Sequence, residues 1–138
     1  MKTILIFCIS LLGFTSMYSQ NIQPADAPDK VYTTVQQKPE FPGDINKFLS
    51  DNIKYPQDAR ANNIQGTVYV QFVVEKDGSV SSAKVLRGVQ GGTSLESEAM
   101  RVVSSMPKWT PGMQNGNAVR VAYLLPIRFA LDNSPSKN

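Results

Sequence analysis

The sequence contains no histidine and only one cysteine, Cys8. These absences exclude a Ser-His-Asp or Cys-His catalytic site, a thiolate or imidazole zinc site, and a haem bound through histidine or cysteine. Carboxylates remain as a source of acid–base chemistry, but Glu96 and Glu98 are two residues apart on a predicted helix and therefore point in different directions. We predict no catalytic residue, no metal site and no cofactor, and hence a protein that is not an enzyme.

An excess of charge of one sign is also missing. The chain has 14 Lys and Arg against 11 Asp and Glu, and its basic residues are spread along the sequence. This pattern excludes nucleic acid as a partner. Because 41% of the 138 residues are apolar and 18% are charged, the chain has the composition of one globular domain.

No apolar run is long enough for a typical transmembrane helix, which needs about 20 residues. The run Ile4–Phe14 has eleven residues, a length that is typical of a signal-peptide core. We therefore predict a signal peptide at residues 1–19 with cleavage near Ser19, and we interpret Cys8 as an apolar filler of its core. The alternative is that the segment stays uncleaved and serves as a marginal anchor.

The first half of the predicted mature chain contains a leader and two short helices. Residues 20–38 are predicted to form a flexible leader, in which Val31–Val35 has the composition of an edge strand. Asp44 is placed to cap a helix that ends near Asn52. Pro56 is placed at the first position of a second helix.

In the second half, apolar residues recur first at every second position, then at helical spacing, and then again at every second position. A strand from Gly66 is followed by Asp77-Gly78, which predicts a hairpin with a type I′ turn. A returning strand ends before Gly91, and a helix capped by Thr93 or Ser94 ends at Pro107. Residues 108–117 are predicted to form a loop before a long last strand.

These elements predict an α+β fold, a small three-stranded antiparallel sheet of ββαβ order with helices packed on one face. The domain is expected to span residues 39–132 and to be followed by a disordered tail at residues 133–138. Pro126 cannot donate a backbone hydrogen bond, so the last strand should lie at a sheet edge and pair with the first long strand.

Several short motifs occur together in a characteristic order and spacing. They are Tyr55-Pro56 with Ala59, Gln65-Gly66-Thr67-Val68, Asp77-Gly78-Ser79-Val80, Glu98-Ala99, Met106-Pro107-Lys108-Trp109-Thr110-Pro111-Gly112, Asn115-Gly116 and Val119 through Phe129. In this order they closely resemble the C-terminal domain of the energy transducer TonB. Pro39–Gly43 resembles the lead-in of standalone members of that family.

The resemblance implies a periplasmic domain that binds the TonB box, a short N-terminal segment of an outer-membrane TonB-dependent receptor, by adding it as a strand. Open, apolar edge strands are a hazard unless a partner uses them, which favours the same interpretation. The implied partner-binding residues are Tyr55, Pro56, Ala118, Val119, Arg120, Val121, Ala122, Tyr123, Leu124 and Leu125.

Two of these residues, Arg120 and Tyr55, also have a purely structural interpretation, and so does Trp109. Arg120 either meets an acidic residue of the receptor segment or protects the edge from aggregation. Tyr55 either lies near that segment or packs over the sheet. Trp109, between two prolines, is expected to anchor its loop to the core.

Two functional hypotheses follow. The first is a transport component that engages a TonB-dependent receptor and, if anchored, an inner-membrane proton-channel complex of the ExbB/ExbD type. The second is a soluble periplasmic adaptor or competitor that is not coupled to the proton gradient. A leader of 19 residues reaches at most about 60 Å, which favours binding over force transmission, and open edges also permit a homodimer.

Overall fold

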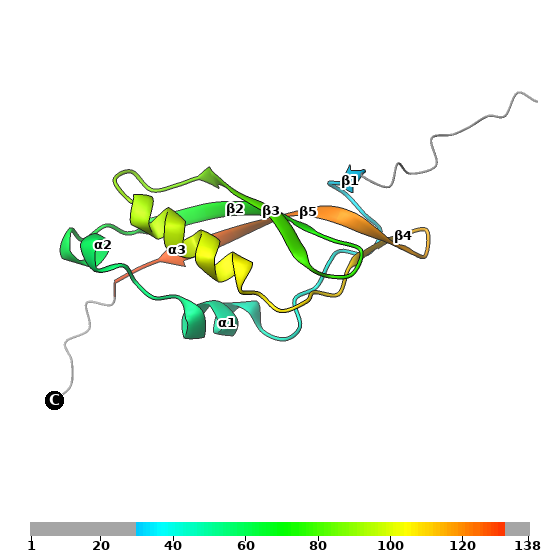
Figure 1. Cartoon of the computed structure of the whole chain (residues 1–138), viewed down its shortest axis with the longest axis horizontal. Coiled ribbons are helices and arrows are strands. Elements are labelled where there is room, and N and C mark those ends of the chain that lie inside the picture. Colours follow the sequence, from blue (N-terminus) through cyan, green and yellow to red (C-terminus); the bar gives the residue numbers. More distant parts are fainter. Residues whose placement is uncertain (1–29, 132–138) are drawn as a thin grey trace, which may run out of the picture.

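A computed structural model of the chain describes residues 30–131 (Figure 1). The predicted signal peptide and the tail at residues 133–138 lie outside these residues. The elements are β1 (Val31–Tyr32), α1 (Ile45–Asn52), α2 (Gln57–Ala61), β2 (Gly66–Val74), β3 (Val80–Arg87), α3 (Thr93–Ser104), β4 (Gly112–Gln114) and β5 (Asn117–Phe129).

The strands form one mixed sheet in the order β1-β5-β2-β3, and β4 pairs with the start of β5. The antiparallel strands β3, β2 and β5 are the predicted three-stranded sheet, and β5 pairs with β2 as expected. The predicted number of strands is wrong, because β1 and β4 are added within the described residues. With two and three residues, these strands are too short to show a period in the sequence. β1 occupies the first two residues of Val31–Val35, whose composition indicated an edge strand.

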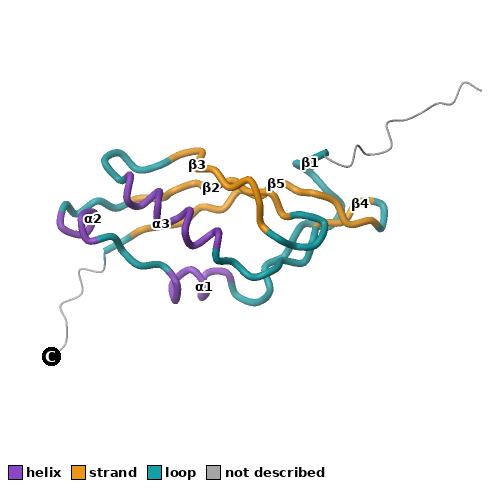
Figure 2. The backbone as a smooth tube through the Cα atoms, viewed as in Figure 1, coloured by secondary structure: helices purple, strands orange, loops and turns teal. Residues whose placement is uncertain are grey.

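One face of the sheet and the three helices enclose the core. The alternating residues of β2 and β5 that were predicted to share a face are buried or half-buried, and α3 adds Leu95, Ala99, Val102 and Val103. The helices lie along one end and the middle of the elongated molecule, whereas β1 and β4 lie at its other end (Figure 2). The predicted α+β layering is therefore present, and none of the described helices lies at the end that carries β1 and β4.

The helix starts agree only in part with the predicted caps. Asp44 caps α1 as expected, because its Oδ1 accepts hydrogen bonds from the backbone N–H groups of Asn46 at 2.9 Å and Lys47 at 3.2 Å. The predicted side-chain cap of α3 is wrong, since Thr93 is already helical and Gly92 occupies the cap position. Pro56 likewise precedes the first residue of α2 instead of occupying it.

The hairpin predicted at Asp77-Gly78 is present, but its turn is not of type I′. Within this turn only Gly78 has a positive φ, of 86°, and the N–H of Glu75 donates to the carbonyl of Ser79 at 2.8 Å. The three-residue loop thus needs a left-handed conformation at its last position alone. A two-residue turn with positive φ at both positions, Asn115 at 51° and Gly116 at 77°, instead joins β4 to β5, inside the region predicted to be a loop.

Candidate interaction site at the outer edge of the last strand

The strand β5 changes neighbours along its length. Residues 117–119 pair with β4, Arg120 and Val121 pair with β1, and residues 121–129 pair with β2. From Ala122 onward, no described strand other than β2 pairs with β5. The structure thus places Ala118, Val119, Arg120 and Val121 of the predicted edge beside β4 or β1, and it leaves Ala122, Tyr123, Leu124 and Leu125 with an open outer edge.

Main-chain groups of alternate residues face this open edge. A proline fits inside a strand only where its nitrogen points away from the paired neighbour. Because backbone N–H groups alternate along a strand, the position of Pro126 opposite Tyr69 indicates that Ala122 and Leu124 direct their N–H groups away from β2. The edge can therefore donate to and accept from an added strand over these residues.

A groove of about 360 Å³ lies beside the open edge. One wall is formed by Val121, Ala122, Tyr123 and Leu124 of β5, and the other by Thr33, Thr34, Val35, Lys38 and Pro39. Leu124 on this edge is 49% exposed. The groove thus offers apolar surface next to unpaired main-chain groups.

The second wall of the groove is fixed to the hairpin of β4 and β5. Gln37 and Met113 exchange two backbone hydrogen bonds, of 3.1 Å and 2.9 Å. The side chain of Gln36 accepts from the backbone N–H of Asn115 at 2.9 Å. Residues 36–37, which belong to the predicted leader, therefore hold the wall in place against β4.

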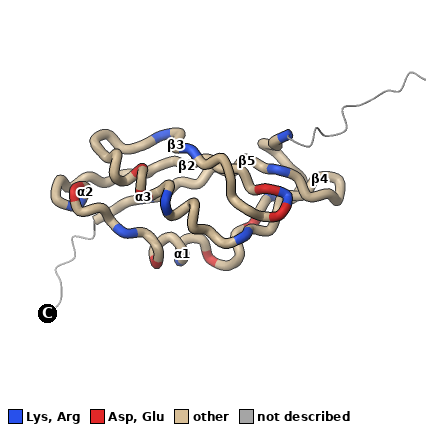
Figure 3. Tube along the Cα trace, viewed as in Figure 1, with Lys and Arg blue, Asp and Glu red and all other residues tan. Residues whose placement is uncertain are grey.

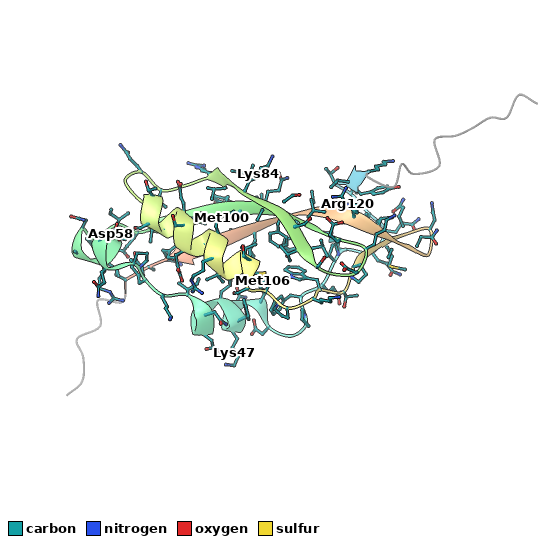
Figure 4. All side chains as sticks on the ribbon, in the orientation of Figure 1. Lys47, Asp58, Lys84, Met100, Met106 and Arg120 are labelled. Atoms are coloured by element: carbon teal, nitrogen blue, oxygen red, sulfur yellow. The ribbon has the colours of Figure 1, made fainter. Side chains whose placement is uncertain are left out.

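The side chain of Arg120 forms an ion pair with a carboxylate of its own chain, that of Glu75. Its Nε donates to Oε2 of Glu75 at 2.7 Å, and both side chains are about three-quarters buried. The Arg120 guanidinium, together with a hydrogen bond from Ser81, holds the pKa of Glu75 below its usual range, against the effect of burial. Figure 4 labels Arg120 on β5 beside β1, and Figure 3 shows basic and acidic positions close together at this end of the sheet.

Tyr55 and Pro56 lie toward the other end of β5. The Tyr55 hydroxyl donates to the carbonyl of Ile64, and its ring meets that of Phe129 edge-on at 5.9 Å. Burial raises the pKa of the Tyr55 hydroxyl. A second cavity, of about 250 Å³, lies between Tyr55, α1 and residues 127–130. Tyr55 thus packs along the same strand as the groove but is not part of the groove's lining.

Trp109 has the anchoring position that the sequence predicts. It is 3% exposed and contacts the rings of Phe41, Phe72 and Tyr123 at 5.5, 5.4 and 4.8 Å. Since Tyr123 lines the groove, this aromatic cluster supports the groove from the core side.

The sequence reasoning missed the groove wall at residues 33–39. Its residues are distant in sequence from β5, so no local period could reveal the contact. The β-branched run Val31–Val35 was the available signal, and its first two residues form β1.

Among residues 30–131, no helix has the length and apolar character that crossing a bilayer requires. These residues also contain no group of three or more acidic, histidine or cysteine side chains arranged to hold a metal ion.

The solved structures to which this chain is similar include two solution structures of the TonB-CTD of Helicobacter pylori. One is 27% identical and covers 62% of this chain and 88% of that one, with a TM-score of 0.48. The other is 24% identical and covers 65% and 79%, also with a TM-score of 0.48.

Sequence comparisons identify the family. Protein TonB of Pseudomonas putida is 30% identical over 97 residues, which cover 68% of this chain and 39% of that protein. The chain thus spans about two fifths of the length of this relative. The family described as Gram-negative bacterial TonB protein C-terminal matches residues 51–131, more than half of the chain. The chain belongs to the TonB C-terminal family.

Proposed function

We propose that this domain binds the TonB box of an outer-membrane TonB-dependent receptor by adding it as a strand to the open edge of β5. The observation that carries the proposal is the unpaired edge at Ala122–Leu125 beside the groove. Strand addition obtains its affinity from main-chain hydrogen bonds and its specificity from pockets for alternate side chains. The open edge provides the first and the groove provides the second.

Family membership supports a role in receptor interaction and energised transport. In this proposal the chain acts in the periplasm, as the predicted signal peptide implies, and contributes binding instead of catalysis. Coupling to an ExbB/ExbD-type complex is part of the proposal only for a chain that is anchored.

In this proposal Arg120 does not meet an acidic residue of the receptor segment, which was one of its two predicted roles. Its guanidinium is bound to Glu75, so it orients the edge, and the receptor segment is recognised by the main chain of β5. Tyr55 and Pro56 would meet the segment only if it continues past Pro126 toward Phe129.

The test is a proline placed on the open edge. Ala122→Pro removes an N–H that faces the groove and should weaken capture of TonB-box peptides at least tenfold from an expected micromolar dissociation constant, about −8 kcal/mol. Binding is measured by fluorescence anisotropy with labelled peptides of receptor N-termini. Circular dichroism must show that the variant keeps the native fold.

Arg128→Pro is the matched control. Residue 128 lies on the same strand and has the same alternation as Ala122, but it does not line the groove. This variant should bind the peptides like the unaltered chain. Equal binding by folded Ala122→Pro and Arg128→Pro variants would remove the edge from the proposed function.

A further inference from the structure

The short strand β1 lies on the same edge of β5 as the groove. Val31 pairs with Arg120 and Tyr32 with Val121, and the two strands are parallel. Because β5 lies between β1 and β2 in the sheet, β1 occupies the outer edge directly before the open residues. In Figure 1, β1 sits at the end of the sheet that no helix covers.

The parallel ladder between β1 and β5 stops early. If it continued in register, Thr33, Thr34 and Val35 would stand opposite Ala122, Tyr123 and Leu124. Instead, residues 33–35 leave the strand and line the groove beside these same residues of β5. An extended segment could thus pair with β5 over Arg120–Leu124, whereas β1 pairs with only the first two of these residues.

The chain is tethered next to this edge. Directly after the groove wall, Gln36 and Gln37 are hydrogen-bonded to Asn115 and Met113. Only residues 33–35 separate this attachment from β1. A short tether keeps a binding segment at a high local concentration, in the millimolar range for flexible linkers. Because this attachment does not involve β1, Gln36 and Gln37 could stay bound while β1 leaves the edge.

We propose that β1 is a displaceable, built-in occupant of the binding edge, and that an incoming extended segment runs parallel to β5 and replaces it across Arg120–Leu124. The fitting partner is an extended segment with β-branched or aromatic residues, as in Val31–Val35, because it must pair with the main chain and fill an apolar groove. That this segment is a receptor's TonB box rests on the proposed function.

A disulfide can test whether β1 has to leave. Tyr32 and Val121 are register partners, so Tyr32→Cys/Val121→Cys, in a Cys8→Ser background, can join β1 to β5 within the usual Cα separation. The probe is a fluorescent peptide with the sequence of Lys30–Gln36 of this chain. The full chain is studied in its oxidised and reduced forms, with Val121→Cys/Cys8→Ser as the matched control.

The oxidised variant should show no binding of the peptide, and reduction should restore binding to the level of the control. A second variant, Val31→Gly/Tyr32→Gly, loosens β1 and should bind the peptide about tenfold more tightly than the unaltered chain, because the competent state is more populated. Equal binding by the oxidised and reduced forms, with circular dichroism unchanged, overturns the inference.

Receptor peptides, tested on the same variants, separate this inference from the proposed function. If the chain's own peptide responds to the disulfide and no receptor peptide binds to any variant, the proposed function fails while β1 remains a displaceable occupant. If receptor peptides bind equally to the oxidised and reduced forms, they use another surface, and β1 does not compete with them.

Discussion

Single residues at the β2–β3 turn show how closely the hairpin and the Trp109 loop approach each other. The N–H of Trp109 donates to the carbonyl of Gly78 at 2.8 Å. An added Cβ at Gly78 would lie 1.9 Å from the carbonyl oxygen of Trp109. The sequence predicted a turn glycine and an anchored tryptophan, but not that they touch, because their contact joins segments 31 residues apart.

Gly78→Ala should therefore destabilise the protein through both strain and steric overlap. Gly116 has a similar φ, of 77°, but open space around its Cα, so Gly116→Ala isolates the strain of a left-handed alanine, about 1 kcal/mol. We expect Gly78→Ala to lower the free energy of unfolding by at least about 2 kcal/mol more. Urea unfolding followed by the fluorescence of Trp109 measures both variants. An equal decrease in the free energy of unfolding would show that the hairpin shifts to accommodate the added methyl group at no cost in stability.

At the scale of the elements, those with a clear period were predictable. β2, β5 and α3 have buried residues at regular spacing, and the sequence placed them within a few residues. β4 is too short to show a period, although a two-residue turn joins it to β5. β1 pairs with β5, which is distant in sequence, so its position depends on the assembled sheet. The same is true of the bond between Glu98 and the backbone N–H of Lys54, at 2.8 Å, which joins α3 to the end of α1. From the sequence, Glu98 is interpreted as part of a non-catalytic carboxylate pair and of the motif Glu98-Ala99, but not as a link between the two helices.

The ion pair of Glu75 and Arg120 links the β2–β3 hairpin to β5, and its contribution should depend on pH. Arg120 lowers the pKa of Glu75 below its ordinary value of 4.5 in the folded state. The resulting stabilisation is complete above the unfolded-state pKa and is lost as the pH falls through the lower folded-state pKa. Glu75→Gln should therefore be less stable than the unaltered chain by about 1 kcal/mol at pH 7.

Below both pKa values the two proteins should converge in stability. Urea midpoints at pH 7 and pH 2 provide the comparison, with Asp58→Asn, an exposed carboxylate of α2, as the control that leaves the midpoint nearly unchanged at pH 7. A stability difference that persists at pH 2 would show that Glu75 acts through packing and not through its charge.

At the scale of the whole molecule, the two outer edges of the sheet, at β3 and at β1 beside β5, differ in how they are protected from pairing with another chain. Among the described strands, β3 pairs only with β2. Its ladder is interrupted by register shifts and by a positive φ of 51° at Ser82, and it carries Lys84 and Arg87. Lysines and irregular backbone are features that prevent edge-to-edge association. In Figure 4, Lys84 of β3 lies on the upper side of the view and Lys47 of α1 on the lower side.

Replacing these charges should expose the β3 edge to self-pairing. We expect Lys84→Val/Arg87→Val to form dimers or larger species at concentrations at which the unaltered chain does not change its mass. Sedimentation velocity over a concentration series measures this, and Lys47→Val/Lys108→Val removes the same charge outside the strands. Indistinguishable behaviour of the two double variants would show that β3 is not protected by its charges.

The arrangement of β1 also has a mechanical consequence. A force pulling at Lys30 acts first on the two register pairs of β1, because the attachment at Gln36 and Gln37 comes later in the chain. The first part of the domain to bear the load is then the part that covers the edge. Tension on the N-terminal side would pull β1 away from the outer edge of β5 before it strained the rest of the domain. A chain under load and a chain at rest would then differ in their affinity for an extended segment.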